Sequence, residues 1–513
     1  MKNIKKSRVH PMVILDSVIT GFRLFGIFMI LALKEQNWKY YLLVLAGFLL
    51  LIVIGIFDYF LKSYEVRDGA LIYTKGIINK EAKNINLENI QSIDMSSNIL
   101  YQAFNLLSVD INLVGGKIRI KPLKKEVALN LIDILRELKQ DASEDIASDQ
   151  EEKVQESQKE ILSLSVKDLA FYGLLRVRFF AALGLILALN GKIRDVFKYL
   201  FDNEAYFDEF LQKNAKSVAG NITAIFIVIG IFMILVVIAS IIHTVVKYYN
   251  FVLTTKDNNL LCKYGLLNKK SLVIDIDRIQ SVKLIYPLRY RFFGLTKLSV
   301  ETLTNNVSED LSEQKSTIDV LPLVKNDFAQ NFVKNNLGID LEYYESLESE
   351  KIQRKAKIAL YRWSLFNCSP LPIIVFAILY FANIDLKLEY KFLSSLALYL
   401  VLVSYSILVK NYMLKYNELS YDRHYFKNTF MRQLTIITEF IKVKKVGTIN
   451  SRTNYFMSKR NLAHISINSI GVNSDIKLKY YDRGYKEKLE RDFIVSEVGY
   501  EYNIWEYTLG YML

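Results

Sequence analysis

Long apolar segments dominate this sequence and restrict the folds that it can adopt. A helix needs about 20 apolar residues to cross the hydrocarbon core of a bilayer. Two segments, Tyr40–Leu61 and Ile222–Val246, meet this requirement with charged residues only at their ends. Four further segments qualify although they contain charged residues or prolines: Val13–Leu33, Leu169–Asn190, Leu365–Asn383 and Leu388–Val409. The sequence therefore predicts six transmembrane helices in three hairpins.

The charged residues predict how the chain lies in the membrane. The 66 Lys and Arg against 53 Asp and Glu give a net charge of +13, which fits nucleic acid, an anionic membrane surface or loops beside a bilayer. The apolar segments favour the two membrane explanations. Short cytoplasmic flanks are rich in basic residues, and Lys2, Lys5, Lys6 and Arg8 precede the first segment. We expect a multi-pass protein of the cell membrane with both termini cytoplasmic.

Few residues could carry catalytic or metal chemistry. Two cysteines, Cys262 and Cys368, are too few for a disulfide framework or a cysteine-rich zinc site. The four histidines have no metal-ligand spacing: His10, His243, His424 and His464. We predict no catalytic, cofactor-binding or metal-binding residue, and we expect that the chain is not an enzyme.

An internal repeat defines the organisation of the chain. Shifting the sequence by 189 residues places the run Ile-Gln-Ser-Ile at 90–93 on Ile-Gln-Ser-Val at 279–282, without a gap. The same shift aligns Asp68, Leu71, Gly76, Tyr101, Phe104, Leu106, Val109 and Ile111 with Asp257, Leu260, Gly265, Tyr290, Phe293, Leu295, Leu298 and Val300. A divergent third copy follows the third hairpin, with Phe430 at the glycine position and Val443-Lys444-Lys445 replacing Ile-Gln-Ser.

Each copy has the pattern of several short strands followed by a helix. Leu107–Leu113 and Leu298–Leu303 alternate with a period of two, as half-buried strands do. Amphipathic helices are predicted later, at Val127–Leu138 and Asp327–Leu337. The predicted fold class is an α+β membrane protein in which each hairpin is followed by a small β-barrel with a C-terminal helix.

These elements divide the chain into eight predicted segments. They are hairpin 1 at 1–61, module 1 at 62–140, an acidic linker at 141–168, hairpin 2 at 169–246 with an external loop at 191–221, module 2 at 247–338, a linker at 339–364, hairpin 3 at 365–409 and the divergent module 3 at 410–513. Both linkers are rich in charge and poor in apolar residues, so we expect them to be solvated and flexible.

The order of hairpin and module resembles the bacterial pleckstrin-homology-like (PH-like) membrane proteins of the YdbS/YdbT type, and is closest to the three-module, YdbT-like form. The motifs that carry this resemblance are a glycine, then Ile-Gln-Ser, then Tyr-x-x-Phe-[Gly/Asn]-Leu. Copy 2 matches best, with Gly265, the run 278–281 and the run 287–295. Copy 1 departs at Asn105, and copy 3 departs at most motif positions. The resemblance implies PH-like barrels and a role at the cell envelope, but no established reaction.

The Ile-Gln-Ser runs are candidates for an interaction edge. In a functional interpretation, Gln91, Ser92, Gln280 and Ser281 contact a partner strand or a lipid headgroup. In a structural interpretation, which we prefer, the isoleucines pack inward and the glutamines cap a turn. Four aromatic residues are likewise expected in the core: Tyr101, Phe104, Tyr290 and Phe293.

Five basic residues of module 2 are candidates for contact with lipid: Lys269, Lys270, Arg278, Arg289 and Arg291. Each basic residue near an anionic leaflet is worth about 1 kcal/mol, although solvated charge is an equally good explanation. Nucleic acid is a poor partner for a tethered module without a reading motif.

The functional prediction is a non-enzymatic scaffold of the bacterial cell envelope with a role in envelope stress or antimicrobial tolerance. Its cytoplasmic modules are expected to bind the anionic inner leaflet, one another, or a smaller PH-like membrane protein of the same family. The alternative is a transporter or lipid-handling protein, which needs ionisable groups at mid-span. The central stretches Leu42–Ile56 and Ala224–Ile238 carry no charge, which favours the scaffold.

Overall fold

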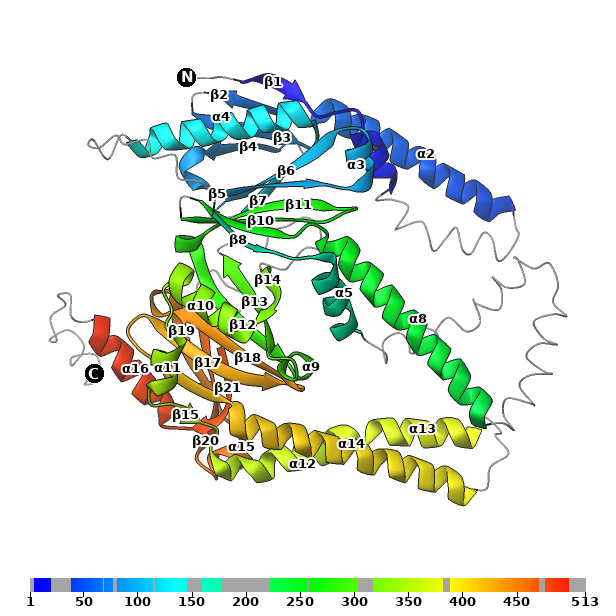
Figure 1. Cartoon of the computed structure of the whole chain (residues 1–513), viewed down its shortest axis with the longest axis vertical. Coiled ribbons are helices and arrows are strands. Elements are labelled where there is room, and N and C mark those ends of the chain that lie inside the picture. Colours follow the sequence, from blue (N-terminus) through cyan, green and yellow to red (C-terminus); the bar gives the residue numbers. More distant parts are fainter. Residues whose placement is uncertain are drawn as a thin grey trace, which may run out of the picture. The chain divides into compact units, whose positions relative to one another are not determined.

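The computed structural model describes residues 4–19, 38–67, 69–76, 81–113, 116–144, 159–177, 222–256, 258–302, 317–381, 388–469 and 476–497. The chain divides into two units, Met1–Asp275 and Ile276–Leu513, and each is described by itself. The elements are labelled in Figure 1. The architecture is α+β, as predicted.

Three helices among the described residues are long and apolar enough to cross a membrane. The candidate spans are Trp38–Leu61, Gly230–Tyr248 and Leu388–Tyr416. They belong to α2 (Trp38–Leu61), α8 (Ile222–Tyr248) and α14 (Leu388–Tyr416). Large apolar side chains such as Leu45, Leu235 and Val401 are exposed along them. A helix with so much exposed apolar surface is expected in lipid.

The other three predicted spans are described in part. Residues 13–19 form a helix, and α5 spans Val166–Leu175, but the remainders of Val13–Leu33 and Leu169–Asn190 lie outside the described residues, as does the predicted loop 191–221. In place of one straight span at Leu365–Asn383, the chain forms α12 (Lys357–Cys368) and α13 (Pro370–Phe381). The break at Ser369 has a physical cause, because Pro370 lacks the N–H that a continuous helix requires.

Four antiparallel sheets hold the strands. The first and second sheets lie in unit 1, and the third and fourth lie in unit 2. In order of hydrogen bonding, the first sheet is β1 (Ile4–Arg8), β2 (Ser63–Arg67), β3 (Ala70–Lys75) and β4 (Glu81–Asn86). The second is β7 (Gly116–Lys124), β6 (Leu106–Leu113), β5 (Ile90–Ser97), β11 (Lys269–Asp275), β10 (Asn259–Tyr264), β9 (Val252–Lys256) and β8 (Lys159–Ser163).

Unit 2 holds a seven-stranded sheet and a three-stranded sheet. The third sheet is β14 (Thr317–Lys325), β13 (Leu295–Thr302), β12 (Ile279–Pro287), β18 (Thr435–Lys442), β17 (Tyr425–Arg432), β16 (Glu418–Tyr421) and β15 (Glu350–Lys351). The fourth is β19 (Val446–Arg452), β20 (Leu462–Ser469) and β21 (Ile476–Asp482). The second and third sheets each join strands of two successive repeats, an arrangement that the sequence did not predict.

Short helices connect the strands. One helical turn precedes each of three equivalent strands: η1 (Leu87–Asn89) before β5, η2 (Ile276–Arg278) before β12 and η4 (Val443–Lys445) before β19. Another short helix follows each: α3 (Ile99–Ala103), α9 (Leu288–Arg291) and α15 (Tyr455–Ser458). The remaining helices are α4 (Lys125–Glu144), α10 (Asn326–Leu337), α11 (Leu341–Ser346), η3 (Arg354–Ala356) and α16 (Tyr485–Glu497).

This order corrects the alignment of the third copy. Val443–Lys445 is equivalent to η1 and η2, so the counterpart of Ile90 is Val446 and the counterpart of Gln91 is Gly447. Phe430 does not occupy the glycine position either, since it lies within β17 opposite Ile437. The turn of that hairpin is made by Gln433, whose φ is +55°.

The predicted linkers contain ordered elements. In each repeat, a strand precedes the helical pair and another follows it, and the two strands are neighbours in one sheet: β1 with β2, β8 with β9, and β15 with β16. β8 lies in the predicted linker 141–168, and α11 and β15 lie in the predicted linker 339–364. The expectation of flexible linkers is therefore wrong for these residues.

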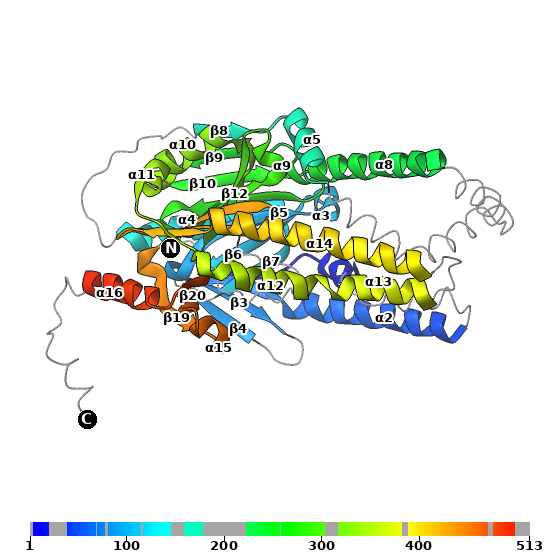
Figure 2. The same cartoon turned by 90° about the horizontal axis from the view of Figure 1, so that it is seen from below.

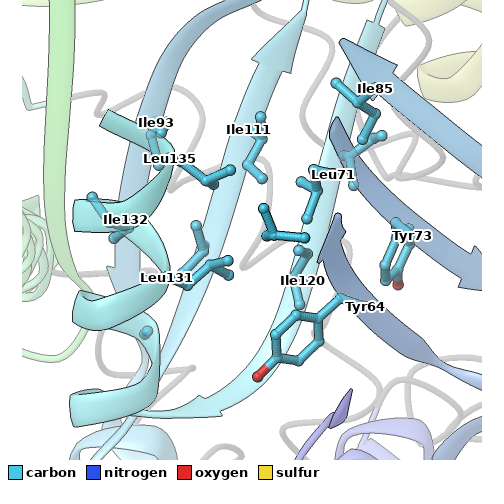
Figure 3. Packing of buried hydrophobic residues seen from close by; sticks show 14 of the residues in the cluster. Tyr64, Leu71, Tyr73, Ile85, Ile93, Ile111, Ile120, Leu131, Ile132 and Leu135 are labelled. Atoms are coloured by element: carbon cyan, nitrogen blue, oxygen red, sulfur yellow. The ribbon is translucent and has the colours of Figure 1, made fainter. Parts of the chain in front are cut away.

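Apolar side chains from the first and second sheets meet α4 in one core. Leu71 and Ile85 from the first sheet, and Ile111 and Ile120 from the second, belong to the same buried cluster. Figure 3 shows Leu131, Ile132 and Leu135 of α4 directed toward these strands. Fully burying such a side chain contributes roughly 1.5–3 kcal/mol.

The same arrangement recurs in unit 2, where strands of the third and fourth sheets share a core with α16. The α4 and α16 helices confirm that a helix follows the strands of a module. In the same unit, α14 lies alongside α12 and α13 (Figures 1 and 2). Ser406 Oγ donates a hydrogen bond to Ser364 Oγ at 2.8 Å between α14 and α12.

Candidate interaction surfaces

Strand pairing joins successive repeats at two places. We call the pair β5 and β11 the first joint and the pair β12 and β18 the second joint. In the first joint, Ser96 lies opposite Lys270. In the second, Ile285 lies opposite Ile437. Ser96 and Ile285 hold equivalent positions in the repeat, as do their partners, so the two joints have the same register.

Polar side chains occupy the centre of the first joint. Asn112 on β6 donates hydrogen bonds from Nδ2 to Ser92 Oγ at 2.7 Å and to Asp94 Oδ2 at 2.8 Å. The second oxygen of Asp94, Oδ1, accepts the backbone N–H of Val273 at 3.0 Å. This last bond crosses the joint from β11. A carboxylate of the first repeat therefore holds the backbone of the second.

Burial raises the pKa of Asp94 to about 6. The hydrogen bonds from Val273 and Asn112 oppose this shift, the nearby carboxylate of Asp110 adds to it, and Lys117 opposes it. Asp110 behaves differently: burial would raise its pKa, but Arg119 and Lys117 bind it and hold the pKa below its usual value. Cations therefore balance the charge of the Asp110 carboxylate, whereas the neighbouring Asp94 accepts hydrogen bonds from neutral donors.

The second joint has an ion pair at its centre. Lys283 on β12 contacts Glu301 on β13 at 2.6 Å and Glu439 on β18 at 3.1 Å. Ser281 Oγ donates to Glu439 at 3.1 Å, and Thr317 Oγ1 donates to Glu301 at 2.9 Å. Lys283 and Glu439 lie directly opposite each other, so the ion pair crosses the joint.

These charges lie in a buried environment. Burial raises the pKa of Glu439, although the ammonium of Lys283 opposes this effect. Burial would lower the pKa of Lys283, but the carboxylates of Glu439 and Glu301 raise it above its usual value. Lys283 therefore remains charged at neutral pH, and its ammonium group forms ion pairs with both buried carboxyl groups.

The predicted edge residues lie on β5 and β12, the strands that take part in these joints. Gln91 occupies a β-bulge between Ile90 and Ser92, and Gln280 occupies the equivalent bulge between Ile279 and Ser281. A bulge places two residues opposite one on the neighbouring strand and bends the chain. Gln280 is buried and its Nε2 donates to the carbonyl of Arg278 at 3.0 Å. β5 and β12 each pair with a strand of the next repeat, but the paired positions are 95–97 on β5 and 281–287 on β12, so Gln91, Ser92 and Gln280 lie beyond them.

The five predicted basic residues are divided between the two units. Lys269 and Lys270 are exposed on β11 in unit 1. In unit 2, Arg278 ends η2, Arg289 is exposed on α9, and the guanidinium of Arg291 lies 6.0 Å from the ring of Tyr416 at the end of α14.

Exposed apolar residues accompany these cations. Tyr101 and Tyr290 are buried, as predicted. Phe104 and Phe293 are 59% and 57% exposed, so the prediction that they lie in the core is wrong. Phe292 after α9 in the second repeat, and Tyr455 and Phe456 at the start of α15 in the third, are also exposed. Each of these short helices or its end therefore presents aromatic surface to its surroundings, a property that sequence periodicity over four or five residues cannot reveal.

The exposed apolar surface continues beside a candidate span. Leu266 and Leu267 are exposed at the turn before β11, and the N–H of Leu266 donates to the carbonyl of Val246 in α8 at 3.0 Å. Gln102 of α3 donates from Nε2 to the carbonyl of Leu267 at 2.9 Å. A groove of about 600 Å³ beside this contact is lined by residues that include Leu129, Lys263, Lys269 and Lys270.

No group of three or more His, Cys, Asp or Glu side chains suited to a metal ion occurs among the described residues. Cys262 is buried, and burial together with the charge of Asp94 raises its thiol pKa to about 12. A thiol of this kind is a poor nucleophile at neutral pH.

Parts of this chain are similar in sequence to known proteins. Residues 16–139 and 217–335 match the Bacterial PH domain family. The UPF0699 transmembrane protein YdbT of Bacillus subtilis is 20% identical over 263 residues, which cover 49% of this chain and 52% of the relative. The aligned region thus spans about half the length of that relative. The predicted resemblance is confirmed: two regions of the chain match the Bacterial PH domain family, and the chain is similar to a transmembrane protein that has been named YdbT.

Proposed function

We propose that this membrane-associated protein is a non-enzymatic scaffold of the bacterial cell envelope whose PH-like modules act as binding surfaces. The observation that carries the proposal is the pair of seven-stranded sheets, each built from strands of two successive repeats. Adding a strand to an exposed sheet edge is a recurring mode of protein recognition. In this chain, the mode already operates between its own repeats, where β11 adds to β5 and β18 adds to β12.

The membrane part of the proposal consists of three hairpins with the modules and both termini on the cytoplasmic side. The strands on either side of each helical pair are neighbours in one sheet, for example β1 and β2. Sheets with charged faces lie in water, so both strands belong on the same side of a bilayer. The intervening chain must then cross an even number of times, which supports two spans in each repeat.

Close helix contacts support the same arrangement. A Cβ atom on Gly55 of α2 would lie 2.8 Å from Ile14 Cα, and one on Gly173 of α5 would lie 2.6 Å from Ile241 Cα of α8. Ser240 Oγ also donates to the carbonyl of Gly173 at 2.7 Å. Small residues let transmembrane helices approach closely. Each contact pairs a partly described predicted span with one of the clear candidates.

The lipid part of the proposal places the exposed aromatic residues in the headgroup region of the inner leaflet. Aromatic side chains favour this region, and basic residues near it are attracted to anionic lipids. Phe292 and Phe293 follow Arg289 and Arg291, and Arg291 packs near the end of α14. This geometry supports contact with lipid by Arg289 and Arg291 more directly than by Arg278, which is half-buried.

Labelling with an environment-sensitive dye tests the lipid contact. In a Cys368→Ser chain, Phe293→Cys carries the dye, and Glu487→Cys on the exposed face of α16 is the control. After reconstitution, vesicles with anionic phosphatidylglycerol should shift emission at 293 to the blue relative to neutral vesicles, and the control should not change. An equal response at both positions would refute the lipid contact.

The partner side of the proposal is a smaller PH-like membrane protein of the same family or another copy of the chain, together with a role in envelope stress. Deleting the gene should reduce survival under membrane-active peptides. Unchanged survival, combined with native membranes that yield no PH-like partner after cross-linking, would defeat the scaffold proposal. A substrate-dependent flux in vesicles containing the purified chain would instead favour a transporter or lipid-handling protein.

A further inference from the structure

In the part of the chain that the structure describes, two sheet edges lack the neighbour that their equivalents have. Within the described residues, β4 ends the first sheet and β19 ends the fourth. The equivalent strands are paired: β11 and β18 correspond to β4, and β5 and β12 correspond to β19. The chain therefore carries one half of a joint in its first repeat and the complementary half in its third.

The backbone of β19 has the form that the joints use. A helical turn, η4, precedes it, as η1 precedes β5 and η2 precedes β12. A bulge lies between Val446 and Thr448, at the position of the bulges that contain Gln91 and Gln280. The third repeat has lost the Ile-Gln-Ser sequence but has retained the bulged strand.

The polar centre of a joint is also present in the fourth sheet, but it is exposed there. Asn468 donates from Nδ2 to Thr448 Oγ1 at 3.2 Å, as Asn112 donates to Ser92 in the first joint. Asn450 holds the position of Asp94 and of Lys283. Asp94 and Asn112 are buried, whereas Thr448 and Asn450 are exposed. A neighbouring strand covers the polar side chains at these positions in both joints, whereas on β19 they are exposed.

We propose that β4 of one copy pairs in antiparallel orientation with β19 of a second copy and forms a third joint between chains. The register common to the two existing joints places Glu81 opposite Arg452 and Lys83 opposite Asn450. The first pair joins opposite charges, and the second offers an ammonium donor to an amide oxygen. Opposite charges directly across a sheet are favourable, and like charges are not.

A second copy fits these edges because each chain carries both halves. The contact is heterologous, since β4 and β19 are different surfaces, so repetition gives a ring if the rotation closes and a filament if it does not. Unpaired strand edges are also sites of unwanted association. The exposed side chains of β4 and β19 include seven polar ones, which disfavour unspecific apolar association: Glu81, Lys83, Asn84, Thr448, Asn450, Ser451 and Arg452.

Cysteine cross-linking in the membrane tests this proposal. Two full-length versions with different tags are co-expressed in a Cys368→Ser background, one with Glu81→Cys and the other with Arg452→Cys. A second combination, Ala82→Cys with Ser451→Cys, covers the adjacent position, because opposed pairs alternate between closer and wider spacing. The control combines Ala82→Cys with Arg452→Cys, which are out of register and point to opposite faces. Cys262 is shared by all versions and is buried.

Mild oxidation should give a disulfide-linked dimer carrying both tags for at least one in-register combination, with a yield several-fold above the control. In an uncross-linked assay of co-purification between tagged copies, Arg452→Glu should reduce recovery several-fold, and adding Glu81→Arg should restore it.

Three results would overturn the proposal. They are a link that forms in a third version carrying both cysteines in one chain but not between the two tagged copies, a link to a smaller PH-like protein but not to the second copy, and no link above the control in either combination. The inference rests on the proposed function only in treating the modules as binding surfaces. The lipid-labelling and survival experiments do not involve β4 or β19, so their failure and the failure of this test are distinguishable.

Discussion

The first and second joints share a backbone register but differ in the chemistry at their centres. In the first, Asp94 accepts an N–H from β11, and no basic side chain of β11 faces it in the shared register. In the second, Lys283 and Glu439 form an ion pair across the equivalent position. The difference shows that backbone pairing builds both joints, while the side chains at one position distinguish them.

This difference makes pairing of each strand with the wrong neighbour unfavourable. Continuing the register of the first joint places Leu272 opposite Asp94. If β18 paired with β5 instead, Glu439 would face Asp94, and like charges would repel each other. If β11 paired with β12, Lys283 would face Leu272 without its carboxylate from the next repeat. Specificity between similar interfaces commonly depends on such unfavourable alternatives.

Lys283→Met tests the importance of the ion pair and should have the largest effect. It leaves Glu301 and Glu439 buried without their shared cation, and removing one partner of a buried ion pair costs about 3–5 kcal/mol. Hydrogen exchange at constant pH should show lost protection in β12 and β18. Lys297→Met is the matched control on β13, because its ion pair with Asp319 is partly exposed and should be worth less than about 1 kcal/mol. Equal losses in the two variants would contradict the account of the second joint.

Asp94 should make the first joint sensitive to pH in a defined direction. Its pKa is raised to about 6, so the folded joint binds this proton more tightly than the unfolded chain does. The resulting stabilisation is present below about pH 4 and is lost as the pH rises through about 6, a change on the order of 3 kcal/mol. Asp94→Asn should therefore reduce the loss of stability between pH 4 and pH 7.

The thiol of Cys262 provides a local measurement, since β10 lies beside β11 in the same sheet. In Cys368→Ser protein, the rate at which a pyridyl disulfide labels Cys262 under mild urea reports opening of the second sheet. Asp110→Asn is the control with the opposite sign: the pKa of Asp110 is lowered, so its contribution is lost as the pH falls. A pH dependence that survives Asp94→Asn unchanged would place its origin elsewhere.

The sequence predicted the strands and the repeat, but not which strands become neighbours. Alternation and glycine positions identify strands locally, whereas a strand can satisfy its hydrogen bonds within its own module or with the next repeat. β1 and β8 escaped prediction because they are five residues long and separated from their partners by a helical pair. Phe104 and Phe293 were misplaced because aromatic residues are usually buried, and exposed aromatic residues in so short a segment have the same local pattern.

Exchanging the side chains of the two joints tests whether this position determines which strands pair. The expected change in stability is smaller than that for Lys283→Met. Leu272→Glu places a carboxylate opposite Asp94 and should weaken the first joint by about 1–3 kcal/mol, while Leu272→Gln should have a smaller effect. Adding Asp94→Lys to Leu272→Glu recreates the pair found in the second joint. We expect a favourable coupling energy of about 0.5–3 kcal/mol in a double-mutant cycle followed by labelling of Cys262. Additive losses would show that this position does not distinguish the joints.

Substituting the side chains of the bulge residues should change the stability least, even though the motif that contains them is the clearest in the sequence. Gly447 already occupies the equivalent place in β19. Gln91→Gly and Gln280→Gly should each change stability by about 1 kcal/mol or less, because the entropy lost by glycine is the main expense. Gln280→Gly also removes a buried amide oxygen that has no hydrogen-bond partner among the described groups.

Deleting Gln91 is the informative contrast. Removing the extra residue makes Ile90 and Ser92 consecutive opposite Leu113 and Asn112, so the strand becomes regular and loses the kink of the bulge. Ile90 and Ile93 would still face the core, but the bend that leads the chain from η1 into β5 would be lost. Hydrogen exchange should show a large loss of protection in β5 and β6 for the deletion and little for Gln91→Gly. The opposite result would mean that the glutamine side chain, rather than the bulge, is what the repeats preserve.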